Sequence, residues 1–482
     1  MLSMLLVRQC RDEEKVIEMR SHFLADACGI IGVFGTGDIA GELGGGLYAL
    51  QHRGQMYSGA GVSAAEGIRV FSHKGPVEEW DASRGDYLIG EIGIGHVGSR
   101  EPQPIKHRSG FGEMAVCFSG YLLNASEILA DMLADGRSFA DGGQAEVISK
   151  VIGSSPDVTH GMERVYSLLS GAFSLLVMTR SALYAARDPR GIRPLVLGWR
   201  QAGWAVAAES RALTLLDFQV KRDLEPGEII RIDSDGVETC KRVDVPRRAH
   251  CAFEWAYISG HDSVIEKVWV RDARRRMGET LAVVDREAGF EADVVAPVPR
   301  SGIGCALGYH QAAGLPYDEV FLDLRDFKRG GRVKNAGKPV FSNPLSVIWP
   351  AVSGRRIVLC DDSLVRGRGI KKRIGELRGA GAREVHVRIA CPPLLFSCDY
   401  GGASGITGEL MARQLVSGLP SENPEMVEKL GVEMGRLVGA DSLRFNTLEK
   451  FVEAIGLKHS DLCLKCFDGK GLETPHPKFS PA

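Results

Sequence analysis

The sequence has no long apolar run and no excess of charge of either sign. Its 482 residues carry 59 Lys and Arg against 61 Asp and Glu, a formal net charge of -2. This balance excludes a global basic field for nucleic acid or membrane surfaces, so any anion site must be local. No stretch reaches the ~18 consecutive apolar residues of a transmembrane helix. We expect a cytoplasmic protein that binds neither nucleic acid nor membrane.

Cysteine is scarce for so long a chain. Eleven cysteines in 482 residues are too few for a disulfide scaffold and are odd in number. They favour reduced thiols, a metal site or a catalytic cysteine. Glycine is abundant instead, with 59 residues. The length and composition together predict a globular protein of two domains.

The texture of the sequence changes twice along the chain. Residues 1–27 look helical, and we interpret them as a leader or propeptide. From Cys28 to about residue 255, short apolar runs punctuated by glycine predict antiparallel sheets. Over 256–482, apolar runs alternate with helical segments, which is typical of a parallel α/β sheet with crossover helices.

The sharpest motif of the second half is an apolar strand pattern that runs into Asp361 and Asp362. A turn containing Arg366 and glycines follows, before a helical segment. Carboxylates at the carboxyl edge of a parallel strand can hold sugar hydroxyls and Mg²⁺, and amides at a helix start bind phosphate. An ordinary turn with an acidic N-cap is the alternative, but the whole combination favours a sugar-phosphate site.

Two cysteine patterns suggest further chemistry. Cys463 and Cys466 form a CxxC loop, with Cys251 and Cys398 as additional thiols. Four thiolates suit zinc or an iron-sulfur cluster, and four buried cysteines without metal are the alternative. Cys28 opens the first strand pattern directly after the leader. If the leader is removed, a free α-amine with a pKa near ~7.7 to 8 can act as base to its thiol, although position alone favours a buried strand cysteine.

These motifs stand among blocks that resemble the amidophosphoribosyltransferases, the glutamine-dependent enzymes that commit carbon to purine synthesis. The resemblance covers nearly the whole chain from Cys28. The blocks follow in family order: CGIIGVFG, ALQHRGQ, RDPRGIRPLVLG, LEPGEIIRI, CAFEWAYIS, ALGYHQAAGLPY, DDSLVRG, REVHVRIACPP and CLKCFDGK.

The resemblance implies both the fold and the reaction. Residues 28–255 would form a class II glutamine amidotransferase domain, an N-terminal-nucleophile αββα sandwich. Residues 256–482 would form a phosphoribosyltransferase-type parallel α/β sheet with a C-terminal cluster-binding segment. The enzyme would make 5-phosphoribosylamine from phosphoribosyl pyrophosphate and ammonia taken from glutamine. We also expect a homo-oligomer, with purine nucleotides as inhibitors.

The resemblance also implies the site residues. Cys28 would be the catalytic nucleophile, and the glutamine-site candidates are Arg53, Arg100, Ser119 and Gly120. Phosphoribosyl pyrophosphate would be bound by Asp361, Asp362, Ser363, Arg366, Gly367 and Gly369. Mg²⁺ would be held by Ser301, Asp361 and Asp362. A 4Fe-4S cluster would be held by Cys251, Cys398, Cys463 and Cys466, because the cluster-bearing branch has cysteines in these four blocks.

Three departures from the family pattern fall on the glutamine site. Gly98 stands where a carboxylate-binding arginine is usual, Ser119 where an oxyanion-binding Asn is usual, and Gln144 where an ammonium-binding Asp is usual. If the contributions were additive, losing the three usual contacts with glutamine would cost on the order of 6 to 10 kcal/mol of substrate and transition-state binding. Arg100, displaced by two residues, is the candidate replacement for the arginine.

The departures leave a second hypothesis open. In it, the chain is a diverged relative without glutaminase activity that acts as an ammonia-dependent transferase or a nucleotide-sensing binding protein. The transferase half is altered too, with Arg300 in place of an acid and Arg368-Gly369 in place of threonines. The basic run Arg325 to Lys338 occupies the position of the family's substrate-covering loop, and a solvated surface is its alternative.

Overall fold

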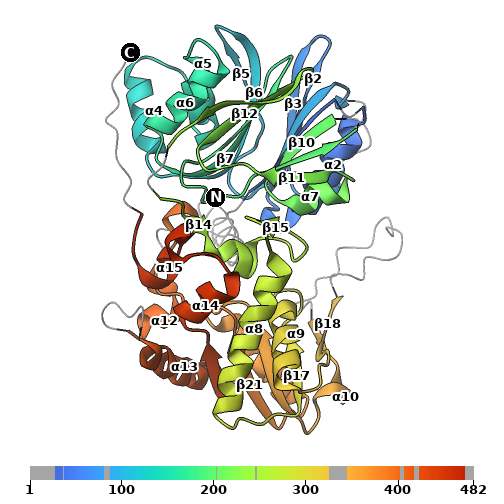
Figure 1. The fold of residues 1–482 in the computed structure, drawn as a ribbon, viewed down its shortest axis with the longest axis vertical. Coiled ribbons are helices and arrows are strands. Elements are labelled where there is room, and N and C mark those ends of the chain that lie inside the picture. Colours follow the sequence, from blue (N-terminus) through green and yellow to red (C-terminus); the bar gives the residue numbers. More distant parts are fainter. Residues whose placement is uncertain are drawn as a thin grey trace, which may run out of the picture. The chain divides into compact units, whose positions relative to one another are not determined.

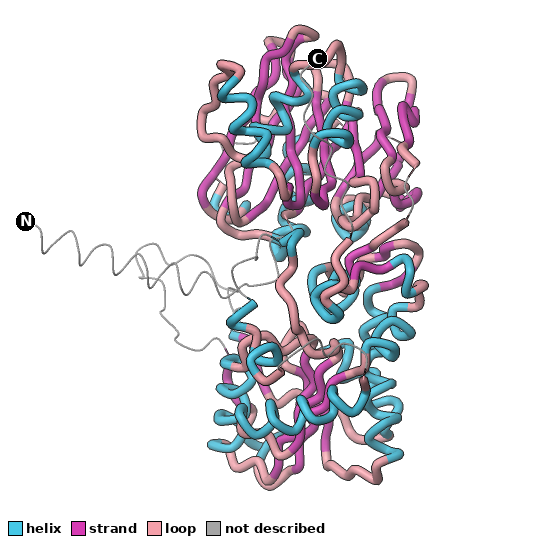
Figure 2. The backbone as a smooth tube through the Cα atoms, turned by 90° about the vertical axis from the view of Figure 1, so that its left-hand side faces the viewer, coloured by secondary structure: helices cyan, strands magenta, loops and turns pink. Residues whose placement is uncertain are grey.

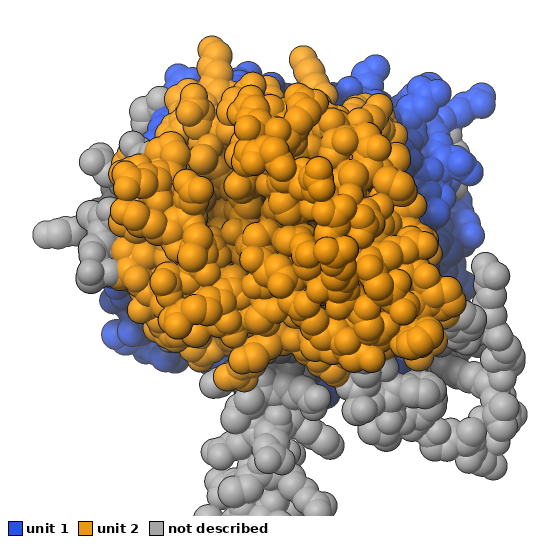
Figure 3. Space-filling view, turned by 90° about the horizontal axis from the view of Figure 1, so that it is seen from below, with its two compact units in different colours: residues 1–250, 398–404, 473–482 blue, residues 251–397, 405–472 orange. Residues whose placement is uncertain are grey.

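The computed structural model describes eight stretches of the chain: residues 28–35, 37–80, 87–201, 203–244, 247–324, 345–401, 407–416 and 423–472. The predicted leader, 1–27, and the basic run from Arg325 to Lys338 lie outside them. The chain divides into two compact units, coloured separately in Figure 3. Unit 1 comprises residues 1–250, 398–404 and 473–482, and unit 2 comprises residues 251–397 and 405–472.

Unit 1 is built on two antiparallel sheets. The first has the strand order β11 (Gln219–Asp223), β9 (Val196–Arg200), β10 (Gly203–Ala207), β1 (Gly29–Phe34), β4 (Ile92–Gly98), β2 (Tyr57–Ala64) and β3 (Gly67–Lys74). The second has the order β13 (Gly236–Arg242), β12 (Glu228–Asp233), β8 (Leu183–Arg187), β7 (Gly171–Met178), β6 (Gly112–Leu122) and β5 (Ile105–Ser109).

The alternation of side chains along β1 explains the layers of unit 1. Successive strand residues point to opposite faces of a sheet. Ile31 packs with the helix α2 (Ile39–Leu50), whereas Ile30 joins the core between the two sheets. The outer face of the second sheet packs against the three helices α4 (Ala125–Ala134), α5 (Gln144–Gly153) and α6 (Val158–Leu168), as Figure 1 shows. The predicted αββα sandwich is thereby confirmed.

Unit 2 contains the predicted parallel sheet, which is confirmed. Its strand order is β17 (Val294–Pro297), β20 (Arg356–Asp361), β21 (Glu384–Ile389) and β22 (Ser442–Phe445). The larger helices around it are α8 (Val270–Glu287), α9 (Ile303–Ala313), α11 (Arg368–Gly379), α13 (Pro424–Val438) and α14 (Leu448–Ile455). Figure 1 labels all of these except α11, and Figure 2 shows helices in cyan around the strands in magenta. Strand β17 and the middle of β20 are apolar, as expected for a parallel sheet covered on both faces. Strand β21 instead alternates apolar residues with Glu384, His386 and Arg388.

Short elements complete unit 2, and one of them, β14, begins at His250, the last residue of the first segment of unit 1. They are the strand pairs β14 (His250–Cys251) with β23 (Leu462–Cys463), β15 (Val264–Ile265) with β16 (Val268–Trp269), and β18 (Phe321–Asp323) with β19 (Leu345–Val347), and the helices α10 (Trp349–Val352), α12 (Met411–Gln414) and α15 (Lys465–Asp468). Among the described residues, every helix is too short or too polar to span a bilayer.

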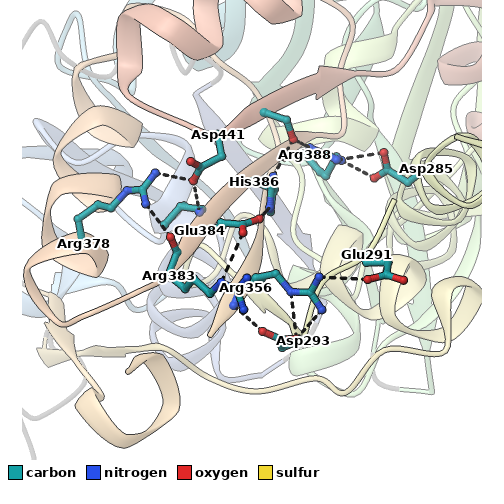
Figure 4. Close-up of polar contacts among 12 residues, drawn as sticks. Asp285, Glu291, Asp293, Arg356, Arg378, Arg383, Glu384, His386, Arg388 and Asp441 are labelled. Atoms are coloured by element: carbon teal, nitrogen blue, oxygen red, sulfur yellow. Dashed lines mark hydrogen bonds and ion pairs between the residues drawn. The ribbon is translucent and has the colours of Figure 1, made fainter. Parts of the chain in front are cut away.

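Ion pairs occupy the amino-terminal edge of the parallel sheet (Figure 4). Arg356, the first residue of β20, pairs with Asp293 at 2.8 Å. Deeper in the unit, buried Asp285 accepts a hydrogen bond from Nη2 of Arg388 at 3.0 Å and another from the hydroxyl of Tyr309 at 2.6 Å. The pair Arg356–Asp293 thus lies at the amino-terminal edge, and Asp285 joins α8 to β21 and α9 in the interior. Ligands of such sheets bind at the opposite, carboxyl edge, where Asp361 ends β20.

Candidate active sites

Cys28 lies directly before β1 and is buried. Its main-chain carbonyl accepts two side-chain hydrogen bonds, from the hydroxyl of Ser119 on β6 and from Nε of Arg53 at 3.2 Å. The structure thus brings the predicted nucleophile and two of the predicted glutamine-site residues together. The Ser119 hydroxyl donates its proton to this carbonyl and not toward the Cys28 sulfur.

Arg53 is held in place by an acid that the sequence analysis missed. Its Nη1 donates to Oε1 of buried Glu209 at 2.6 Å, and Nε2 of His52 lies 2.8 Å from the same oxygen. Burial favours the neutral acid, but His52 and Arg53 outweigh it and hold the pKa of Glu209 well below its usual range. The available signal was an acid just beyond the apolar strand β10.

Gly98 and His96 form the wall of β4 beside Cys28. The register of β4 on β1 pairs Val97 with Gly29, so Gly98 comes opposite Cys28. A Cβ atom at Gly98 would stand 3.0 Å from the Cys28 sulfur and 2.5 Å from Cε1 of His96. The imidazole of His96 therefore fills the space that a side chain at residue 98 would need.

His96 is a second residue that the sequence analysis missed. It is fully buried, and neither ring nitrogen has a hydrogen-bond partner within the described part of the chain. Burial alone lowers the pKa of His96 to about 3, so the ring is neutral at physiological pH. A polar residue within the apolar, glycine-rich strand pattern GIGHVG was the signal.

The end of β6 carries the next part of this site. Gly120 has φ +149°, and an added Cβ would lie 1.9 Å from the carbonyl oxygen of Ala172, so only glycine fits there. The guanidinium carbon of Arg100 lies 4.6 Å from the ring centroid of Tyr121. Nη2 of Arg100 donates a hydrogen bond to the carbonyl of Gly401. Arg100 is therefore close to the strand end that bears Ser119 and Gly120.

Gln144 does not present its side chain as a free acceptor. Its amide oxygen accepts the N–H of Leu122 at 3.0 Å, and its amide nitrogen donates to the Leu122 carbonyl at 3.2 Å. Glu101 lies near the same helix start and accepts the N–H of Ala145 at 3.0 Å. Burial raises the pKa of Glu101 to about 6, despite two backbone hydrogen bonds and the charge of Arg100.

Asp361 and Asp362 form a compact acidic site at the carboxyl end of β20. The hydroxyl of Ser301 and the N–H of Asp362 donate to Oδ1 of Asp361 at 2.7 and 2.9 Å, and the Ser363 hydroxyl donates to Asp362. Burial raises the pKa of both acids, and for Asp361 the charge of its neighbour adds to the effect. The carboxylate of buried Asp362, that of partly buried Asp361 and a hydroxyl are oxygen ligands that suit Mg²⁺, whose charge would relieve this repulsion.

The following turn leads into α11. Gly367 has φ +73° and caps the helix, and an added Cβ would lie 2.6 Å from the Met411 sulfur. A Cβ at Gly369 would meet nothing within 4 Å, so its backbone is open to an approaching group. Arg366 pairs with Glu409 at 2.5 Å. Arg366, Gly367 and Gly369 thus lie at the N-terminus of α11.

The four predicted cluster cysteines are placed as follows. Cys251 and Cys463 lie on the paired strands β14 and β23, and the carbonyl of Cys466 in α15 accepts the N–H of Leu395 at 3.0 Å. Cys398 belongs to unit 1. Within the described ranges, no group of three or more His, Cys, Asp or Glu side chains is arranged to hold a metal ion. The cluster therefore stays a prediction.

Comparisons with known proteins agree with this arrangement. Residues 94–215 match the profile of a glutamine amidotransferase domain. The amidophosphoribosyltransferase of Methanothermobacter thermautotrophicus is 34% identical over 94% of this chain and 95% of its own. That of Bacillus subtilis is 33% identical over 93% and 94%.

Solved structures give the same result. The glutamine phosphoribosylpyrophosphate amidotransferase from B. subtilis, complexed with ADP and GMP, superposes with a TM-score of 0.81 at 30% identity, covering 93% of this chain and 99% of that one. Agreement in sequence and fold over nearly the whole length leaves one conclusion. The chain belongs to the amidophosphoribosyltransferase family.

Proposed function

We propose that this chain transfers ammonia to phosphoribosyl pyrophosphate and forms 5-phosphoribosylamine, the first committed step of purine synthesis. The observation that carries the proposal is the pair of adjacent acids Asp361 and Asp362, whose pKa values are both raised, at the carboxyl end of β20. A glycine-capped helix follows within the same motif. Ammonia attacks C1 of the ribose, and pyrophosphate leaves.

Acidic residues and anion-binding residues act on different parts of phosphoribosyl pyrophosphate. Asp361 and Asp362 accept the ribose hydroxyls, and with Ser301 they would hold Mg²⁺. When bound, that ion neutralises charge on the diphosphate leaving group. Arg366 and the main-chain N–H groups from Gly367 to Gly369 receive the 5-phosphate, because the start of a helix favours anions.

Glutamine would be hydrolysed in unit 1. The Cys28 thiolate attacks the side-chain amide carbon, ammonia leaves, and water hydrolyses the resulting thioester to glutamate. Gly120 is our candidate for an oxyanion donor, and Arg100 for the residue that binds the glutamine carboxylate. Arg53, held by Glu209, fixes the main chain of Cys28.

We further propose a structural 4Fe-4S cluster on Cys251, Cys398, Cys463 and Cys466. Its support is the donor set of four thiols and the pairing of the strands that carry Cys251 and Cys463. Purine nucleotides are proposed as inhibitors, since the related B. subtilis structure is a complex with ADP and GMP. A homo-oligomer in the cytoplasm completes the proposal.

A second candidate is an ammonia-dependent transferase without glutaminase activity. Two observations favour it. The side-chain amide of Gln144 is hydrogen-bonded to the main chain of Leu122, and Gly98 has no side chain that could bind the glutamine carboxylate. Pyrophosphate release from phosphoribosyl pyrophosphate, measured with glutamine and with ammonium chloride, separates the two candidates. Activity with glutamine that Cys28→Ala abolishes supports the first. Activity with ammonia alone, unchanged by Cys28→Ala, supports the second. Failure of both donors would refute the transferase proposal.

A further inference from the structure

Arg300 lies in the turn between β17 and α9 and has a left-handed backbone. Its φ is +70°, a conformation that residues with a side chain rarely adopt. Glycine takes such a position without steric cost, whereas an arginine there strains the main chain. Residues that are kept in a strained conformation cluster at ligand-binding and catalytic sites. The turn that holds Arg300 therefore deserves a comparison with the acidic site beside it.

Hydrogen bonds fix this turn to the carboxyl end of β20. The N–H of Val298 donates to the carbonyl of Cys360 at 2.8 Å, and the N–H of Gly302 donates to the carbonyl of Val298 at 3.0 Å. A Cβ at Gly302 would stand 2.1 Å from the Cys360 oxygen, so only glycine fits there. Ser301, the next residue after Arg300, donates its hydroxyl to Asp361 at 2.7 Å. Arg300 is thus anchored beside the acidic site, at the edge where parallel sheets bind their ligands.

The guanidinium of Arg300 is oriented by an acid of strand β18. Its Nε lies 3.1 Å from Oδ2 of Asp323. The side chain of Asp323 is 8% exposed, whereas that of Arg300 is 57% exposed. An ion pair with so exposed an arginine adds little to stability. The pair instead holds a positive charge in a fixed place at the surface of the turn.

The proposed substrate needs positive charge in this place. The 5-phosphate meets Arg366 and the start of α11, but the diphosphate comes to Asp361 and Asp362, whose like charge opposes it. Mg²⁺ offsets part of this repulsion. An arginine can offset more, because its planar fork donates two N–H groups to phosphate oxygens. Arg300 stands where the family pattern has an acid, so the turn in this chain is positive instead of negative.

We propose that Arg300 binds the diphosphate group of phosphoribosyl pyrophosphate and supplies part of the charge that Mg²⁺ would otherwise supply. This inference rests on the proposed transferase and adds a substrate-binding residue to it. During transfer the bond between C1 and the diphosphate oxygen breaks, and its electron pair stays on that oxygen. Ammonia forms the new bond to C1 and loses one proton to solvent. Arg300 gains and loses no proton, and its charge stabilises the leaving diphosphate.

Titration calorimetry of the full chain with sodium pyrophosphate tests the proposal, once in EDTA and once in Mg²⁺. Arg300→Gln removes the charge and keeps much of the side-chain length. In EDTA it should bind pyrophosphate about tenfold more weakly than wild type or worse, since hydrogen bonds between charged groups are strong. In Mg²⁺ the loss should be smaller, because the ion offsets part of the same charge. Ribose 5-phosphate, which has no diphosphate, should bind both proteins equally.

Two further variants separate the charge from the backbone and from ion pairing in general. Arg300→Gly should fold and unfold like wild type within a few degrees, because glycine adopts a φ of +70° without strain. It should still lose pyrophosphate affinity as Arg300→Gln does. Arg355→Gln removes a comparable ion pair, with Asp318 at 3.2 Å, at the opposite edge of the sheet. It should bind pyrophosphate with wild-type affinity.

Three results would overturn the proposal. They are wild-type pyrophosphate affinity of Arg300→Gln in EDTA, a wild-type protein that binds no pyrophosphate without Mg²⁺, and an equal loss of affinity for ribose 5-phosphate, which would mean that the turn only shapes the site. The proposed function fails differently. If the Arg300 variants bind pyrophosphate normally in a protein that forms phosphoribosylamine, the transferase stands without this residue. If they lose pyrophosphate affinity in a protein that forms none, Arg300 binds diphosphate and the transferase is refuted.

Discussion

Gly98 lies against the sulfur of Cys28, since a Cβ atom on this residue would stand only 3.0 Å from it. Gly98→Ala should therefore crowd the sulfur and displace the ring of His96. We expect Cys28 alkylation and glutamine hydrolysis to slow about tenfold or more, through lost transition-state stabilisation. The ammonia-dependent transferase should be unaffected.

Gly110→Ala is the matched control for that variant, because an added Cβ there meets nothing within 4 Å. It should alkylate at the wild-type rate. If Gly98→Ala does so as well, the space at residue 98 has no part in the reactivity of Cys28.

Arg100→Ala should raise the KM for glutamine and leave the ammonia-dependent rate unchanged. A hydrogen bond to a charged group contributes roughly 1.5 to 3 kcal/mol, which corresponds to about a tenfold to hundredfold loss of affinity. Steady-state kinetics with both nitrogen donors measures the effect. Arg108→Ala, an exposed arginine of β5, serves as control. An unchanged KM would mean that another residue binds the carboxylate of glutamine.

Asp361→Asn and Asp362→Asn should each abolish transfer from both nitrogen donors. Titration calorimetry with phosphoribosyl pyrophosphate and Mg²⁺ should show lost binding, whereas Asp318→Asn, in an exposed ion pair with Arg355, should bind normally. Unchanged affinity for phosphoribosyl pyrophosphate in both variants would mean that the sugar-phosphate site lies elsewhere.

The same variants test the electrostatics of the pair. The folded-state pKa of both acids is raised, so their contribution to stability is present below the usual carboxyl pKa and is lost as the pH rises. At neutral pH without Mg²⁺, either Asn variant should therefore unfold at a higher temperature than wild type in a thermal melt.

Cys466→Ser should remove the proposed cluster. Anaerobically purified wild type should be brown and contain about four iron atoms per chain, the stoichiometry of a Cys₄-held 4Fe-4S centre. The variant should lose the iron and the visible absorbance, while Cys240→Ser on β13 should keep them. Stoichiometric zinc without iron in the wild-type protein would contradict the assignment.

Asp285→Asn should strongly destabilise unit 2, because it leaves the buried guanidinium of Arg388 without its acid. Breaking a buried pair costs about 3 to 5 kcal/mol. The partly exposed Asp293 pairs with Arg356 at the sheet edge in Figure 4. Asp293→Asn should therefore lower the free energy of unfolding by only about 1 kcal/mol or less. Urea unfolding of both variants gives the comparison, and equal losses would contradict it.

The sequence by itself determined the architecture and the acidic motif. Strand alternation and the strand-helix rhythm are local patterns, so they predict the antiparallel sheets and the parallel sheet without knowledge of distant contacts. The sandwich arrangement of the antiparallel sheets followed from the family resemblance. Asp361, Asp362 and the turn after them lie within ten residues of one another, and their site is built almost entirely by β20 and the start of α11.

Tertiary structure decided the surroundings of Cys28. Glu209 meets Arg53 across 156 positions of the sequence, and the register of β4 on β1 alone brings Gly98 opposite Cys28. The space left at Gly98 then determines where the ring of His96 lies. No local pattern encodes these relations, because strand pairing joins distant segments and a buried side chain takes the conformation that its packed neighbours leave open.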